Sequence, residues 1–134
     1  MSQTYDQLAA GYEFPPGNFK LDAIRVAVFL KATGDPGRLY HEAKAPPMAI
    51  AALAMSALFN TISLPPGTIH VSQELSFIEA VSIDEDLTSY AKLSRTQKRA
   101  KLHLITVDFD VRNQGQKTVL TGRTSFMLPQ EEGQ

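Results

Sequence analysis

An uncharged stretch from Met48 to Ile62 is the feature that most constrains how this chain folds. As a helix it would rise about 22 Å, and its fifteen residues fall short of the roughly 20 that a membrane span needs. A helix that is apolar on every side is normally buried. Pro47 suits the first turn, and Leu64-Pro65-Pro66-Gly67 ends the element. The stretch therefore predicts one central helix inside a globular fold, and no membrane association.

The rest of the chain predicts a second helix and a sheet. Leu21 to Thr33 has near-helical apolar spacing, with Asp22 placed to cap its start and Gly34 to cap its end. After Gly67, apolar and polar residues alternate with a period of two, which is typical of strands around residues 69–77, 87–93, 105–111 and 120–128. Consecutive strands of this kind indicate an antiparallel sheet with one covered face. We expect an α+β fold in which a curved sheet surrounds the uncharged helix.

Composition limits the classes of protein that fit. The length of 134 residues predicts a single domain, 1–134, with an N-terminal arm over 1–20 and a flexible tail over 130–134. Thirteen basic and fourteen acidic residues give a net charge of −1, which provides no strong field for nucleic acid or an anionic membrane. The absence of cysteine excludes disulfides and thiolate sites. The N-terminus lacks the pattern of an export signal, so we expect a cytoplasmic protein.

Two segments carry a family resemblance. The first is Ala32-Thr33-Gly34-Asp35-Pro36-Gly37-Arg38-Leu39-Tyr40, and the second is Ala45-Pro46-Pro47-Met48 at the head of the uncharged helix. With the order of elements, they resemble the MaoC-like branch of the hot-dog fold over roughly residues 5–128. The resemblance implies the activity of (R)-specific enoyl-CoA hydratases and 3-hydroxyacyl-thioester dehydratases, which act on acyl-CoA or acyl-carrier-protein thioesters without a cofactor.

The catalytic candidates follow from this resemblance. Asp35 matches the family aspartate, which acts with a histidine on a water or on the 3-hydroxyl of the substrate. The family histidine lies five positions after the aspartate, where this chain has Tyr40, and His41 follows one residue later. A backbone N–H at the helix start stabilises the developing oxyanion in the family, but Pro47 here has none. Alternatively, Asp35 only caps a turn and Tyr40 only packs.

Substrate contacts are expected in two places. The resemblance implies an acyl pocket between two hot-dog halves, lined by Met48, Leu53 and Phe59. Arg95 and Arg99 belong to the basic run Ser94–Lys101, which is either a solvated hairpin tip or a contact for CoA phosphates or an acidic carrier protein.

The remaining histidines and acids predict no metal site. His70 and His103 lie among polar neighbours and are expected to be solvated, and no histidines and acids have metal-ligand spacing.

Two functions stay open at this point. The chain is a hydratase or dehydratase that uses Asp35 with His41 or Tyr40, or it is a non-catalytic subunit resembling the N-terminal half of double-hot-dog enzymes. Such a subunit binds the acyl chain and completes the site of a catalytic MaoC-like partner. A thioesterase ranks last, because the uncharged helix offers no activating carboxylate. In either case we expect a homodimer or heterodimer, since a single sheet leaves an open edge.

Overall fold

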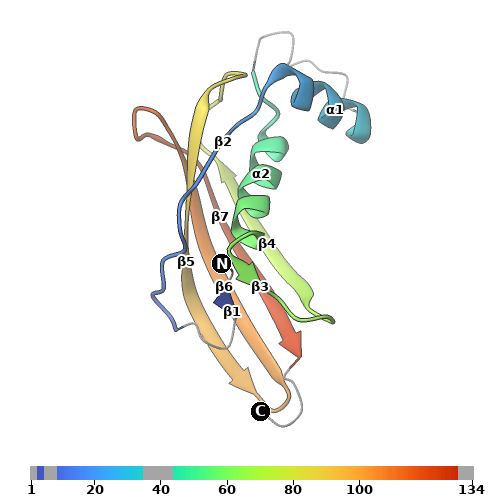
Figure 1. The fold of residues 1–134 in the computed structure, drawn as a ribbon, viewed down its shortest axis with the longest axis vertical. Helices are drawn as coiled ribbons and strands as arrows, with labels where there is room; N and C mark the ends of the chain where they lie inside the picture. The colour runs from blue at the N-terminus through green and yellow to red at the C-terminus, as the bar shows by residue number, and fades with distance from the viewer. Residues whose placement is uncertain (1–2, 5–8, 35–43, 130–134) are drawn as a thin grey trace.

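The computed structural model describes residues 3–4, 9–34 and 44–129, which form a curved sheet with one helix along its face (Figure 1). Five antiparallel strands have the order β2-β5-β6-β7-β4. Their bounds are β2 Gly17–Lys20, β4 Ile69–Phe77, β5 Asp86–Arg99, β6 Leu102–Asn113 and β7 Thr118–Pro129. Two short parallel strands, β1 (Gln3–Thr4) and β3 (Ile62–Ser63), pair separately. The expected α+β architecture is confirmed.

Helix α2 (Pro47–Phe59) covers the inner face of the sheet, as its lack of charge predicts. Its buried residues are Ala49, Ile50, Ala51, Ala54, Met55 and Leu58. Small residues allow a close approach, since a Cβ added to Gly17 of β2 would lie 2.8 Å from the Cβ of Ala57. The expected end at Ile62 is wrong. The helix closes earlier, because Thr61 donates from its N–H and hydroxyl to the carbonyl of Leu58.

Helix α1 (Ala23–Thr33) lies beyond the N-terminal end of α2 (Figure 1). Both predicted caps are confirmed: the carboxylate of Asp22 accepts a 2.8 Å hydrogen bond from the N–H of Arg25, and Gly34 takes a left-handed conformation with φ of 71°. Ile24 and Val28 are 77% and 64% exposed, so the described residues leave one apolar side of this helix uncovered.

Strand β4 departs from the regular alternation that the sequence predicts. The pattern places Ile69 and Phe77 on one face, but a β-bulge at Val71 shifts the register. Ile69 is therefore opposite Met127 on the outer face, and Phe77 is opposite Leu120 on the inner face. An extra residue in one strand reverses the direction of every side chain beyond it.

The inner face of β6 and β7 forms the centre of the core. His103, expected to be solvated, is only 1% exposed, because it shares the inner side of β6 with Ile105 and hydrogen-bonds the Thr96 hydroxyl. The Phe109 ring lies over Gly122 of β7, its partner in the register. A Cβ added to Gly122 would approach that ring to 2.3 Å, so only glycine leaves room for it.

We predict that Gly122→Ala lowers the free energy of unfolding by about 1–3 kcal/mol, because the new methyl group collides with the Phe109 ring. Urea denaturation measures this change. Gly115→Ala, at a turn where the added Cβ would meet its nearest atom at 3.4 Å, is the matched control. Equal stability of the two variants would contradict the packing described for Phe109.

Candidate functional site

The catalytic candidates Asp35, Tyr40 and His41 lie in residues 35–43, outside the residues that the structure describes. The ends of this segment are well defined. It begins after Gly34, which ends α1, and the chain resumes before Ala45, whose N–H donates a 2.7 Å hydrogen bond to the carbonyl of Val81. The segment therefore connects the end of α1 to the start of α2.

The start of α2 lacks the usual backbone donors. Pro46 is the N-cap residue and Pro47 the first residue of the helix, and neither has an N–H. No side chain in the described part of the chain caps this end. The first N–H of the helix therefore belongs to Met48, which makes this group the candidate donor for a developing oxyanion at the helix start.

The side of α2 that faces away from the sheet is mostly apolar. Met48 and Phe59 are 52% and 42% exposed and share one stripe with Ala52 and Ser56. Leu53, the third residue expected in an acyl pocket, is half-buried and lies about 100° around the helix from Ala52. Phe59, at the C-terminal end of the stripe, packs edge-on against Phe126 of β7, whereas the described residues leave Met48 and Ala52 exposed.

Near the C-terminal end of α2, a small cluster surrounds His70 on the inner side of β4. The His70 ring stacks on Phe126 with centroids 4.9 Å apart, and Phe59 meets Phe126 edge-on at 5.5 Å. The Nε2 atom of His70 is 2.7 Å from the hydroxyl of Thr124, which also donates to the carbonyl of Ser72 at 3.5 Å. His70 is exposed, as expected of a solvated histidine, and its ring is held in place by Phe126 and Thr124.

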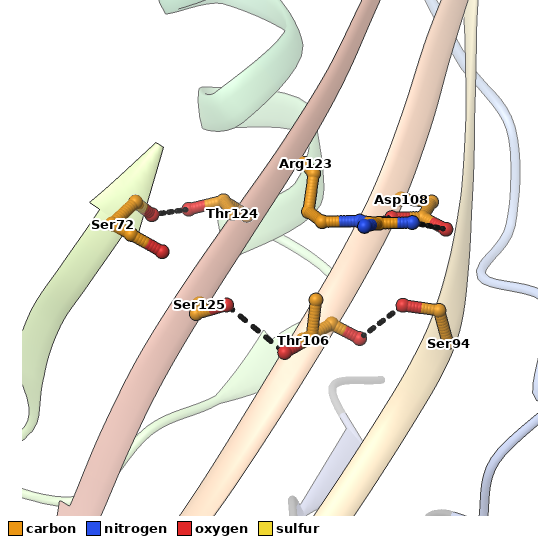
Figure 2. A network of polar contacts seen from close by, with 7 residues as sticks. All are labelled: Ser72, Ser94, Thr106, Asp108, Arg123, Thr124 and Ser125. Carbon is orange, nitrogen blue, oxygen red and sulfur yellow. Dashed lines mark hydrogen bonds and ion pairs between the residues drawn. The ribbon is translucent and has the colours of Figure 1, made fainter. Parts of the chain in front are cut away.

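The outer face of the sheet carries rows of polar side chains across its strands (Figure 2). One row joins hydroxyl groups: Ser125 is 2.9 Å from Thr106, and Ser94 donates to the Thr106 carbonyl at 3.1 Å. The adjacent row alternates in charge along the register: Glu13, Lys92, Asp108, Arg123 and Glu74. Cross-strand pairs of opposite charge stabilise the register of a sheet.

Ion pairs tie these charges together. Arg123 forms two hydrogen bonds to Asp108, at 2.7 and 3.3 Å, and this bonding and the nearby negative charge raise the pKa of Arg123. Arg112 bonds to Asp110 at 2.7 Å and lies over the Tyr90 ring, and its hydrogen bond to Asp110 raises its pKa in the same way. Both arginines therefore stay charged at neutral pH.

An open depression of about 990 Å³ lies over this charged row, bordered on one side by Glu13 to Pro16. None of Met48, Leu53 and Phe59 lines this depression. An acyl chain in this depression would remove water from the paired charges on its floor, and removing charged groups from water is unfavourable. We therefore place no acyl site there.

The basic run forms the β5–β6 hairpin, at the end of the molecule away from α1 (Figure 1). Arg95 and Arg99 point to the outer face, as their register opposite Thr106 and Leu102 requires. Both are exposed, and neither forms an ion pair with another described residue.

The described residues contain neither a candidate metal site nor a candidate membrane-spanning helix. No group of three His, Cys, Asp or Glu side chains in them could hold a metal ion. Neither of their helices is long and apolar enough to cross a membrane.

Sequence reasoning missed the His70 cluster and the charged row. The cluster depends on the bulge at Val71, for which the sequence gives no signal. The charged row could have been found in part, because Asp108 and Asp110 already alternate with apolar residues along their strand.

Comparison with known proteins supports the resemblance. A family model that describes the FAS1-like dehydratase domain region matches residues 9–122. No curated protein sequence matches the chain significantly.

Solved structures share the fold at low sequence identity. Unliganded R-hydratase PhaJ1 from Pseudomonas aeruginosa has a TM-score of 0.78 and 22% identity, over 95% of this chain and 86% of that chain. A MaoC-like dehydratase from Rhodospirillum rubrum has a TM-score of 0.76 and 18% identity, over 95% and 97%. The HadBC (3R-hydroxyacyl-ACP dehydratase) complex from Mycobacterium tuberculosis gives 0.70 and 17%, over 88% and 96%. These likenesses confirm the hot-dog fold.

We predict that Thr124→Val lowers the free energy of unfolding by about 1 kcal/mol, because the fully buried hydroxyl bonded to His70 is lost while the shape is kept. Thermal or urea unfolding measures the change. Thr121→Val, on the half-exposed outer side of the same strand, is the control and should change stability less. A larger loss in the control would contradict the role given to Thr124.

Proposed function

Because the chain belongs to the family of the FAS1-like dehydratase domain region, we propose that it adds water to, or removes water from, acyl thioesters. The substrate is an enoyl or 3-hydroxyacyl group carried by coenzyme A or by an acyl carrier protein. The match spans residues 9–122, nearly the whole chain, and is the observation that carries the proposal.

Asp35 and His41 are the proposed acid–base pair, with Tyr40 beside them. In hydration, the pair removes a proton from a water, the oxygen of that water bonds to the β carbon, and a proton is delivered to the α carbon. In dehydration the same steps run in reverse. The negative charge that develops on the thioester oxygen needs a donor, and the N–H of Met48 is the first that α2 can offer.

The outward stripe of α2 is the proposed binding surface for the acyl chain. Met48 and Phe59 lie on it, with Leu53 at its border, and their exposure supports this assignment. A hydrocarbon chain on this stripe needs a cover, which a second protomer would supply. The acyl pocket would then lie between two protomers.

A second candidate function is a non-catalytic subunit. Pro46 and Pro47 remove two backbone donors from the start of α2, and Tyr40 stands where the family pattern has its histidine. Such a chain would bind the acyl group, while a catalytic MaoC-like partner supplies the acid–base pair. The HadBC structure that this fold resembles is itself a complex.

Strand β4 is the proposed edge for the second protomer. It spans nine residues at the end of the sheet, has no lysine or proline, and carries the exposed Val71 and Phe77. Natural edge strands are usually protected from pairing, and apart from the bulge at Val71 and the charge of Glu74 this strand has no such protection, which favours pairing with a partner. We propose a homodimer or a heterodimer formed along β4. We also propose that the protein is cytoplasmic, and a sequence without cysteine is compatible with that compartment.

We predict that the purified chain hydrates crotonyl-CoA and that Asp35→Asn lowers kcat by about 10²–10⁴-fold, because the acid–base pair is lost. Loss of absorbance of the enoyl thioester measures the rate. Asp84→Asn, at an exposed position with φ of 71° that asparagine tolerates, is the control and should keep full activity.

Activity only after addition of a second hot-dog chain would support the subunit function instead. Hydration by the lone chain that survives Asp35→Asn would contradict the proposed chemistry.

For the edge, we predict that Val71→Lys with Phe77→Lys converts a dimer into a monomer, because the two charges would be buried at the junction. Light scattering measures the mass. Ile24→Lys with Val28→Lys on α1 makes the same change at apolar positions that are more exposed and should leave the mass unchanged. A dimer that persists in the β4 variant would contradict the assignment.

A further inference from the structure

The outer face of the sheet changes character towards the β5–β6 hairpin. Around Asp108 it is charged, but one register step past the hydroxyl row it is apolar. Ile69, Met127 and Leu104 are neighbours across β4, β7 and β6, and Pro129 is opposite Leu102 in the next row. Ile69 is 62% and Leu102 46% exposed. We call these five residues, together with Arg95 and Arg99, the hairpin-end surface.

Positive charge borders this apolar patch. Arg95 and Arg99 flank it on the same face of β5, and Lys98 and Lys101 extend the charge around the tip. From Leu87 to Val107 the sequence contains five basic residues and no acid. By contrast, the cations Arg112, Lys117 and Arg123 each form an ion pair with an acid. A chain of net charge −1 thus leaves a cluster of unpaired cations at one end of its described structure.

The arrangement does not suit a small phosphate group. Lys98 projects to the inner side, opposite His103, while Arg95 and Arg99 project to the outer side. Arg95 and Arg99 are four residues apart on a strand, which separates their Cα atoms by about 13 Å. All four cations are exposed, so they form no buried cradle in which several donors converge on one anion. A broad acidic surface can contact them together.

We propose that the hairpin-end surface docks an acidic acyl carrier protein, with the apolar patch as the centre of the contact and the arginines as its rim. Interfaces commonly have such an apolar centre with a polar border. The inference rests on the proposed thioester function, and it selects a carrier protein over free coenzyme A as the form in which the acyl group arrives.

The proposed dimer places this surface on the side of the partner's β4 from which the chain continues to the start of α2. Two β4 strands that pair antiparallel about a two-fold axis bring the Ile69 end of one protomer beside the Phe77 end of its partner. Beyond Phe77 the chain reaches Val81, which bonds to Ala45 just before α2. A carrier protein on one protomer would therefore deliver its acyl group to the site of the other protomer.

The test measures binding of a purified bacterial acyl carrier protein, loaded with a crotonyl group, to the intact dimer by fluorescence anisotropy. Arg95→Glu with Arg99→Glu should weaken binding by about tenfold or more, because two attractions become repulsions. Leu102→Asn should weaken it without changing the charge. Binding to the unaltered chain should also decrease as salt increases, since the screening length falls from about 30 Å at 0.01 M to about 3 Å at 1 M.

Lys20→Glu with Lys31→Glu is the matched control, because it makes the same charge change at exposed positions of β2 and α1 and should leave binding unchanged. A chain that ends at Pro129 should bind at least as tightly, since it lacks Glu131 and Glu132. Equal weakening by the control pair would overturn the proposal. So would binding to vesicles of anionic lipid without binding to the carrier protein.

Hydration of crotonyl-CoA, measured on the same variants, separates this proposal from the proposed function. Full activity on crotonyl-CoA with weakened carrier binding in the Arg95/Arg99 variant supports docking at the hairpin end. Normal carrier binding in that variant would overturn the docking surface and leave the hydratase function standing. If the unaltered chain does not hydrate crotonyl-CoA, the proposed function is contradicted. The effect of the Arg95/Arg99 variant on carrier binding still decides whether the docking surface is correct.

Discussion

The burial of α2 is the constraint on which the rest of this structure depends. A helix with no charge cannot face water on most of its surface, and the sheet provides the cover by curving around it. The close contact of Gly17 with Ala57 and of Gly122 with Phe109 shows how little space the inner face leaves. The sheet leaves Met48 exposed and touches Phe59 only through its edge-on contact with Phe126, and this remaining apolar surface is where we propose that a substrate and a second protomer bind.

The two faces of the sheet differ in composition and in role. The inner face is apolar and holds α2, with His70 and Thr124 at its border near the β4 edge. The middle of the outer face carries paired charges such as Arg123 and Asp108, which stabilise the register and remain hydrated (Figure 2). Only at the hairpin end does the outer face combine apolar side chains with unpaired cations. The positions that we propose for catalysis, assembly and carrier docking therefore lie at different edges of one small domain.

Much of the fold follows from local sequence signals. The caps of α1 were predictable because Asp22 and Gly34 are residue types with strong positional preferences, and the strands because their alternation is regular. The bulge at Val71 could not be predicted, because it depends on how β4 pairs with β7 and not on the local preferences of the sequence. That one residue also decided where His70 points. The burial of His103 was missed although its spacing of two residues from Ile105 places it on the inner side of β6, because an ionisable side chain is rarely fully buried. The catalytic candidates Asp35, Tyr40 and His41 rest on sequence alone, since they fall outside the described residues.

The central claim is that a second protomer completes the surface formed by β4 and the outward stripe of α2. Hydrogen–deuterium exchange of residues 69–77 in the purified protein tests it most directly, because alternate amides of this edge strand face away from β7, beyond which the described part of the chain places no further strand. The account predicts slow exchange at those amides under conditions where the protein is assembled. Exchange at the rate of an unprotected peptide under the same conditions would contradict it.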